Sequence, residues 1–230
     1  MCGRFTLATD AETLAAHFEL PALAAESVPP RFNIAPSQNA AVIRLTRSMD
    51  RKLDLIAWGL IPSWATDSAV GARLINARAE TLASKPAFRH AFARRRCLVP
   101  TDGFFEWQRI EGGKQPYLIR MCTGEPFALA GLWERWRDGQ GAVVDSFTIV
   151  TTPPSELLAP IHDRMPAIIL PADYDRWLAR DRTDVADLLR PRADIALQAI
   201  PVSTRVNNTA HDDDSCVTPI GPPLKINQGR

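Results

Sequence analysis

The chain has 230 residues, of which 46% are apolar and 23% are charged. This composition is ordinary for globular proteins, and it excludes a chain that is disordered throughout. The formal net charge is only +1, so the overall charge does not indicate a nucleic-acid-binding protein, and any such binding must come from a local surface.

The N-terminal sequence lacks the basic and apolar regions of a signal peptide, and no apolar run approaches the about 20 residues of a membrane span. We therefore expect a cytoplasmic protein without a membrane segment. The four cysteines are far apart and form no CxxC pair, so the sequence predicts neither a zinc site nor a disulfide framework. Cys97 and Cys122 lie in apolar runs and are expected to be buried thiols.

Few helices are predicted along the chain. The first is indicated by a capping-box pattern at Thr9 and Glu12, by Leu14 and Phe18 on one face, and by Pro21 at its end. Three further helices are predicted over residues 84–96, 174–180 and 185–190, the last stopped by a proline.

Strand-like runs are more numerous than helices, and a turn at residues 111–114 predicts a β-hairpin. Because few helices separate the runs, a regular βαβ sheet is disfavoured. We predict an α+β fold, mainly antiparallel, with a barrel-like β core and a few peripheral helices. One domain is expected over residues 1–220, followed by a loosely ordered tail over 221–230. The predicted strands are residues 3–7, 41–46, 53–60, 104–109, 116–122, 126–133, 146–152, 167–170 and 195–202.

Cys2 is the first candidate for chemistry. Removal of Met1 would leave a residue with an α-amine that titrates at about 7.7–8.0 and a thiol near 8.5. The amine condenses with an aldehyde to a Schiff base, and the thiol can then close a thiazolidine ring on the same carbon. A chance cysteine at a disordered terminus is the alternative. The strand predicted immediately after it, over residues 3–7, favours a terminus that is held in place.

Three more positions are candidates, each with a structural alternative. Glu106 lies among aromatic residues, where desolvation would raise its pKa, although it could also face solvent on an edge strand. His162 lies in a loop between two prolines, which is either a functional loop or a charged turn. Asn76 is best interpreted as the N-cap of a short helix, where Arg78 could meet a phosphate. Exposed tryptophans such as Trp64 suit stacking on unpaired bases, although most of the six are expected in the core.

Seven segments in order together resemble one family, and the resemblance runs from Met1 to about residue 220. The family is SRAP, the SOS response-associated peptidases. The aromatic pair before Glu106 is Phe-Phe where family members often carry Tyr, and this leaves the carboxylate in place. The segments are MCGRF at the start, RFNIAPSQ (31–38), WGLIPSWA (58–65), NARAET (76–81), DGFFEW (102–107), IHDRMP (161–166) and VSTRVNN (202–208).

This resemblance implies a β-rich fold that shields abasic sites in single-stranded DNA, including junctions and overhangs, by a covalent link to Cys2, with autocatalytic removal of Met1. It implies no metal or other cofactor. We expect a monomer in the cytoplasm, associated with the nucleoid in a bacterium. The resemblance implies catalytic roles for Cys2, Asn76, Glu106 and His162, and DNA contacts by Arg4, Pro36, Trp64, Arg78, Trp107, Thr151 and Arg164.

Three other functions remain open at this stage. The same Cys2, Glu106 and His162 could form an N-terminal-nucleophile peptidase, which cuts added peptides or only its own first bond. A noncovalent single-strand-binding module would keep its full function without Cys2. A structural domain with a chance cysteine would have neither activity. The substrate distinguishes these functions from one another: a peptide for the peptidase and DNA for the binding module.

Overall fold

A closed five-stranded barrel forms the centre of the protein in the computed structural model, which describes residues 2–192 and 195–224. Strand β10 pairs with both β4 and β9, and β3 and β6 complete the ring between them. All these pairs are antiparallel except β10–β4. The barrel strands are β3 (Asn39–Leu45), β4 (Arg51–Trp58), β6 (Arg96–Thr101), β9 (Phe127–Arg137) and β10 (Val143–Thr152).

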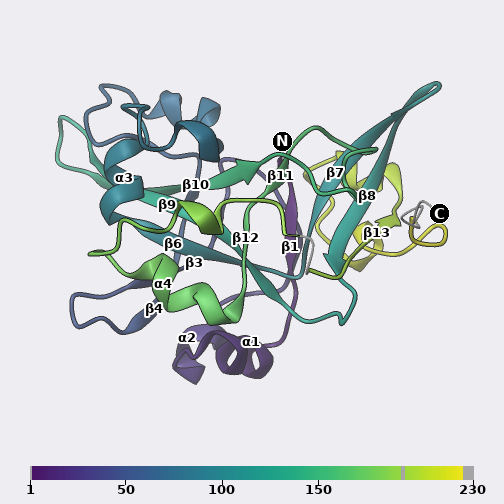
Figure 1. The fold of residues 1–230 in the computed structure, drawn as a ribbon, viewed down its shortest axis with the longest axis horizontal. Helices are drawn as coiled ribbons and strands as arrows, with labels where there is room; N and C mark the ends of the chain where they lie inside the picture. Colours follow the sequence, from purple (N-terminus) through teal and green to yellow (C-terminus); the bar gives the residue numbers. More distant parts are fainter. Residues whose placement is uncertain (1, 193–194, 225–230) are drawn as a thin grey trace.

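A second sheet of five strands lies beside the barrel, in the order β13-β8-β7-β1-β2. In Figure 1, β1 lies in the middle of the molecule, between the barrel and the pair β7–β8 on the right. The N-terminal residues are therefore placed at the junction of the two sheets. The strands of this sheet are β1 (Phe5–Leu7), β2 (Arg31–Ile34), β7 (Gly103–Ile110), β8 (Gly113–Met121) and β13 (Leu197–Pro201).

Three short strands extend the barrel sheet. β5 runs parallel to β10, with Asn76 opposite Ile149, and β11 and β12 pair with β10 and β9. This architecture confirms the predicted mainly antiparallel α+β fold with a barrel-like core. Among the described residues, no helix has the length and apolar character needed to cross a bilayer. The short strands are β5 (Asn76–Arg78), β11 (Met165–Pro166) and β12 (Ile168–Ile169).

Apolar residues explain why the barrel strands form. All six residues of β6 are buried, and so are the first six of β9. Such continuous buried runs are typical of strands that are covered on both faces, unlike the alternating burial of β4. Gly131 allows β6 and β9 to approach closely, since a Cβ there would lie 2.7 Å from Cys97 Sγ.

The helices are short and peripheral, and two helix predictions need correction. The sequence predicted Thr9 as the cap of the first helix, but Asp10 caps it by accepting from the Thr13 N–H at 2.9 Å. The Thr9 hydroxyl instead donates to Asp102 on the loop before β7. The helix predicted over residues 84–96 is helical only within α3, because its last residue already belongs to the buried strand β6. The helices are α1 (Ala11–Phe18), α2 (Ala22–Glu26), α3 (Arg89–Arg94) and α4 (Tyr174–Leu178).

Several connections are single turns of 3-10 helix. One of them, at Ala186–Leu188, replaces the helix predicted over residues 185–190. Of the predicted tail, residues 225–230 lie outside the described part of the chain, while the Leu224 N–H donates to the Ala199 carbonyl. The other turns are Ser68–Arg73, Ala79–Thr81, Pro171–Asp173, Thr204–Asn207 and Asp214–Cys216.

Candidate functional site

A cleft of about 670 Å³ opens beside the junction of the two sheets. One wall is the β7–β8 hairpin, which contributes Glu106 and Trp107 from β7 and Lys114 from β8. The opposite wall is the loop 159–163, which contributes His162 and Asp163. Two segments that are about 50 residues apart in the chain therefore face each other across one cavity.

Glu106 is the most buried ionisable group of this cleft, with 2% of its side chain exposed. Burial raises its pKa to about 7, and the neighbouring charge of Asp163 acts in the same direction. Its Oε2 lies 4.0 Å from His162 Nε2. A carboxyl group with a pKa near neutrality can both accept and donate a proton, so Glu106 is suited to general acid–base catalysis.

His162 is oriented by its own loop. The Arg164 N–H donates to Nδ1 at 3.0 Å, and Asp163 Oδ1 lies 2.8 Å from the same nitrogen. Burial lowers the pKa of His162 below its usual value, while the charge of Asp163 opposes this shift. The Arg164 N–H favours an Nδ1 that carries no proton, whereas the Asp163 carboxylate favours an Nδ1 that carries one, so both groups hold the ring with Nε2 facing Glu106.

Cys2 is fully buried in a chain that still begins at Met1. Its thiol donates to the Arg4 carbonyl at 3.8 Å. Burial raises the pKa of this thiol, and the charge of Glu106 raises it further. The sulfur is therefore closed to solvent but lies within electrostatic reach of the Glu106 carboxylate. It is an S–H group at neutral pH, and a base must take its proton when it reacts.

Asn76 connects Cys2 to the barrel. Its side-chain amide donates to the Cys2 carbonyl at 2.8 Å, and the pairing of β5 with β10 fixes its backbone. The amide oxygen, Oδ1, is buried without a hydrogen-bond partner among the described residues. The predicted helix N-cap role of Asn76 is wrong, because the residue lies in a strand and the following 3-10 turn begins only after Arg78.

The residues expected to bind phosphates differ in how available they are. Arg78 is exposed. The Arg164 guanidinium is only 12% exposed; it pairs with Glu80 at 2.6 and 3.0 Å and donates to the Thr151 carbonyl at 2.5 Å. Thr151 is fully buried, and its hydroxyl lies 3.4 Å from Arg164 Nη2. Arg78 lies opposite Thr151 in the β5–β10 pair, and Arg164, which directly precedes β11, contacts Thr151.

Arg4 and Trp107 are both tied to the loop 203–217. Arg4 Nη1 donates to the Val206 carbonyl at 2.6 Å, and Trp107 Nε1 donates to Asn207 Oδ1 at 2.7 Å. Burial lowers the pKa of Arg4. Pro36 is half-buried, whereas Trp64 is 63% exposed. Of the two tryptophans predicted to contact bases, Trp64 therefore has an exposed ring, whereas the ring of Trp107 is held by the side chain of Asn207.

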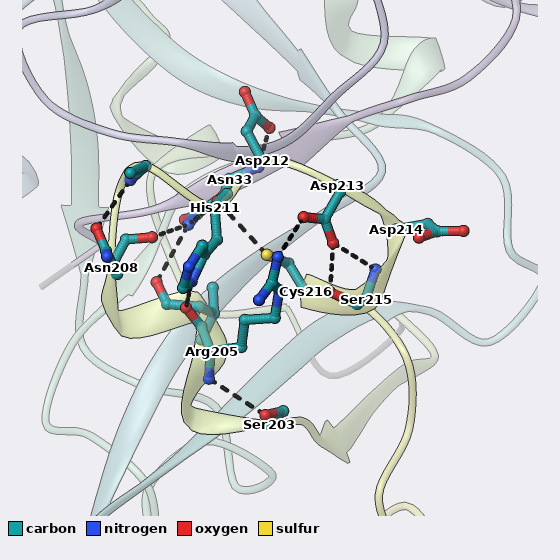
Figure 2. Close-up of polar contacts among 12 residues, drawn as sticks. Asn33, Ser203, Arg205, Asn208, His211, Asp212, Asp213, Asp214, Ser215 and Cys216 are labelled. Atoms are coloured by element: carbon teal, nitrogen blue, oxygen red, sulfur yellow. Dashed lines mark hydrogen bonds and ion pairs between the residues drawn. The ribbon is translucent and has the colours of Figure 1, made fainter.

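Asn33 organises the loop 203–217, and sequence reasoning assigned it no role. It is fully buried, and its amide nitrogen donates to the carbonyls of Val206, Asn208 and His211. Its Oδ1 accepts from Arg4 at 2.8 Å. Figure 2 shows Asn33 beside this loop, with Cys216 donating to the His211 carbonyl at 3.5 Å. The sequence could have pointed to this contact, because Asn33 lies in the motif RFNIAPSQ and residues 206–208 lie in the motif VSTRVNN.

The structure thus brings together the four residues expected to be catalytic. Asn76 contacts Cys2, Cys2 is influenced by Glu106, and Glu106 faces His162. The prediction that Cys122 is buried is wrong, since this residue is exposed at the end of β8, whereas Cys97 is buried as expected. No group of three metal-binding side chains gathers within residues 2–192 and 195–224.

A family model described as SOS response associated peptidase (SRAP) matches residues 1–209. The chain belongs to the SRAP family. It is 38% identical over 222 residues to the abasic site processing protein YoqW of Bacillus subtilis, covering 94% of this chain and 99% of that protein. It is 30% identical to the abasic site processing protein HMCES of Gallus gallus, covering 83% of this chain and 66% of that protein.

Solved structures of similar fold agree with the SRAP assignment. A protein from Bacteroides thetaiotaomicron superposes with a TM-score of 0.84 at 25% identity, covering 95% of this chain and 99% of that one. A protein from Bordetella bronchiseptica gives a TM-score of 0.73 at 27% identity, with coverages of 88% and 100%. The barrel and the second sheet are therefore features that this SRAP chain shares with experimentally determined structures.

Proposed function

We propose that this protein processes abasic sites in single-stranded DNA by forming a covalent thiazolidine link between Cys2 and the sugar aldehyde. The observation that carries the proposal is the buried Glu106 carboxyl group, whose Oε2 lies 4.0 Å from His162 Nε2 and whose charge acts on the Cys2 thiol. Its pKa of about 7 supports a role in proton transfer. The names of the relatives, which are called abasic site processing proteins, support the abasic site as the substrate.

The proposed chemistry needs Met1 to be removed first, because the amine of Cys2 is otherwise part of a peptide bond. The free amine adds to the aldehyde of the ring-opened sugar, and loss of one water gives the imine. The Cys2 sulfur then attacks the imine carbon, and the nitrogen takes up the proton that leaves the sulfur. The link contains only protein and DNA atoms, so no metal or other cofactor is required.

Each nearby side chain has a role in this sequence. In its neutral form, Glu106 first donates a proton to the hydroxyl group that leaves as water when the imine forms. The Cys2 thiol is protonated at neutral pH, so the resulting carboxylate then accepts the thiol proton as sulfur attacks and passes a proton to the nitrogen. His162 Nε2 faces the same carboxylate, and we assign it to opening the sugar ring and to protonation when the link reverses. Asn76 holds Cys2 and presents an unused acceptor, Oδ1, to a sugar hydroxyl.

We propose that the DNA strand on either side of the abasic site binds along the residues that were expected to contact DNA. Arg78, which is exposed, is the most available phosphate ligand. Arg164 and Arg4 already hold protein carbonyls, so each would share its donors with phosphate. Thr151 is buried, so its proposed role is to position Arg164. Trp64 offers a face for an unstacked base, while Pro36 and Trp107 pack nearby bases or the duplex end.

The decisive test is an intact mass spectrum after incubation with single-stranded DNA that contains an abasic site. The parent protein should lack Met1 and gain the mass of the oligonucleotide less one water. Cys2→Ala should give no adduct and should retain noncovalent binding. Cys122→Ala is the matched control, because Cys122 is the exposed free thiol, and it should crosslink fully.

Two further outcomes of this experiment bear on the proposal. A residue added before Cys2 should silence the protein, because it removes the free amine. An undiminished adduct in that extended form, or in Cys2→Ala, contradicts the proposal.

The competing peptidase function uses the same residues and differs in its substrate. The thiol of Cys2 could act on a peptide bond with His162 or Glu106 as its proton acceptor, and the bond closest to it is Met1–Cys2. We propose that this activity is limited to autocatalytic removal of Met1. In Glu106→Gln, retention of Met1 in the mass spectrum supports this step. Steady turnover of added peptides by the parent protein would instead favour a general peptidase.

A further inference from the structure

A second basic region lies apart from the Cys2 site, in a cleft of about 590 Å³ between the β3–β4 hairpin tip, α3 and the outer part of β9. In Figure 1, α3 and this hairpin tip lie on the left, while β7 and β8, which line the Cys2 cleft, lie on the right. We name this region the distal basic cleft. Its cations are Arg44, Arg47, Lys52, Arg94, Arg95, Arg135 and Arg180.

The distal basic cleft concentrates positive charge in a chain that is almost neutral. Seven cations line the cleft together with one carboxylate, that of Asp54, and two further carboxylates, Glu134 and Asp145, form ion pairs with lining arginines. Within this described set, the cations exceed the carboxylates by four when His90 is neutral. The whole chain has a net charge of +1, so the remainder of the molecule is net negative. This separation creates a local positive potential that the overall charge conceals.

The carboxylates do not neutralise the cleft, because each is shared. Asp54 pairs with Arg44 at 2.6 Å and with Lys52 at 2.6 Å. Asp145 likewise pairs with Arg44 at 2.8 Å and with Arg135 at 2.7 Å. These shared pairs fix the cations in a rigid array on the barrel surface, and rigid cations lose less entropy when they bind an anion.

Two arginines remain free to bind. Arg47, on the hairpin tip, and Arg94, in the last turn of α3, are both exposed and have no hydrogen-bond or ionic partner among the described residues. Arg180 also lines the cleft and, among the described residues, donates to the carbonyls of Leu45 and Thr46 beside the hairpin tip. The cleft thus presents cations that lack a carboxylate of their own.

Trp133, the aromatic residue of the cleft, is half-buried and in contact with cations of the lining. Two guanidinium groups lie over the Trp133 ring, with Arg44 Cζ at 4.3 Å and Arg95 Cζ at 5.4 Å from its centroid. The indole holds the cations in place. The surface is therefore suited to recognise charge rather than sequence.

We propose that the distal basic cleft binds the phosphate backbone of duplex DNA, without base specificity and separately from the strand at Cys2. Duplex DNA has one negative charge per about 1.7 Å of its axis, the densest regular array of phosphates available to such a surface. The cleft would hold a duplex segment away from the lesion and so raise the local concentration of the damaged strand. This contact does not depend on the chemistry of Cys2.

The test measures binding of an undamaged duplex oligonucleotide by fluorescence anisotropy across a series of salt concentrations. The full chain carrying Cys2→Ala serves as the parent, so covalent capture plays no part. In the double variant Arg47→Ala/Arg94→Ala, the slope of log K against log salt should decrease by about 2 in magnitude. The affinity should fall at low salt and converge with that of the parent at high salt.

The controls separate a local contact from a general effect of charge. Arg190→Ala removes an equally exposed cation elsewhere on the surface and should leave duplex affinity unchanged, whereas Arg94→Ala alone should lower it. Arg94→Lys should restore most of the affinity, because a phosphate contact needs charge rather than a planar fork. If the double variant unfolds thermally at the same midpoint temperature as the parent, misfolding is excluded as the cause of weaker binding.

Three results would overturn the proposal. The first is a double variant that binds duplex with the affinity and salt slope of the parent. The second is an equal loss in Arg190→Ala, which would mean a general charge effect. The third is a parent that does not bind duplex but binds anionic phospholipid vesicles through Arg47 and Arg94, which would identify a membrane surface instead.

Discussion

At the scale of a single residue, burial and the proposed chemistry favour opposite protonation states of Glu106. Burial favours its neutral form and raises its pKa to about 7, whereas the proposed reaction needs the carboxylate to accept a proton from Cys2. Neither form is strongly disfavoured at neutral pH, so the residue can alternate between them. The charged form is tolerated in the folded protein at a cost that should appear in stability measurements.

That cost gives a prediction for the pH dependence of unfolding. Because the folded pKa of Glu106 is raised, its contribution to stability is fully present below about pH 4.5 and is lost as the pH rises through about 7. Glu106→Gln stays neutral, so its stability relative to the parent should increase between pH 5 and pH 8. A rise of the pKa from 4.5 to about 7 corresponds to a change of at most about 3 kcal/mol in the free energy of unfolding.

The measurement is urea unfolding of both proteins at several pH values. Glu111→Gln, in the exposed hairpin turn, is the control and should differ from the parent by the same small amount at every pH. A constant difference between Glu106→Gln and the parent would contradict the raised pKa.

The loop 203–217 contacts two of the residues predicted to bind DNA, Arg4 and Trp107, and the buried side chain of Asn33 is central to its anchorage. Asn33 donates to three of its carbonyls and accepts from Arg4. Asp212 adds to this anchorage by accepting from the N–H groups of Phe32 and Asn33 at 2.6 and 2.8 Å. Trp107 reaches the same loop through Asn207, so the loop links β2, β1 and β7.

Removing the Asn33 side chain should therefore loosen this loop. Asn33→Ala removes three hydrogen bonds to loop carbonyls and the acceptor of one Arg4 N–H, although each carbonyl keeps a second donor. At about 1 kcal/mol for each lost hydrogen bond, we expect a loss of about 2–4 kcal/mol in the free energy of unfolding. Hydrogen exchange should also accelerate across residues 203–217. Thr209→Ala, which replaces an exposed threonine of the same loop whose side chain makes no hydrogen bond among the described residues, should change stability by less than about 0.5 kcal/mol. Slow exchange in Asn33→Ala would show that the loop has another anchor.

The elements that the sequence predicted well are those whose local pattern agrees with their final pairing. The β7–β8 hairpin has a glycine-containing turn and apolar flanks, and its register follows from the turn. β6 was missed because its first residue continues the arginine-rich pattern of α3, and only pairing with β3 and β9 makes it a strand. β5 is three residues long, and its parallel partner β10 lies about 70 residues later.

Contacts between segments that are distant in the chain were also beyond sequence-based prediction at the candidate site. The motifs identified the residue types at Cys2, Asn76, Glu106 and His162. No local pattern could show that Asn76 donates to the Cys2 carbonyl, or that the Cys2 thiol is closed to solvent. Those facts depend on how two sheets meet, and they change the chemistry, because a buried thiol needs a proton acceptor that an exposed one would not.

Closure of the barrel is the property of the whole molecule that holds the two sheets in position. β9 pairs with β6, β10 and β12, and Gly131 lies opposite Cys97 on one side and Ile149 on the other. A Cβ at Gly131 would lie 2.7 Å from Cys97 Sγ and 2.9 Å from Val99 Cγ2. The ring therefore closes around a position where a methyl group has no space. Since β10 also carries β5 and Asn76, strain at this position would be transmitted towards the site.

Gly131→Ala should destabilise the protein by about 1–3 kcal/mol, the usual penalty for overpacking a core. The clash is mainly with the Cys97 sulfur, so Cys97→Ala should relieve part of it even though that change alone creates a small cavity. The double variant should then be more stable than the sum of the two single effects implies, by about 1 kcal/mol. Chemical unfolding of the four proteins measures this coupling. Simple additivity would mean that the strain at Gly131 comes from Val99 or the backbone rather than from Cys97.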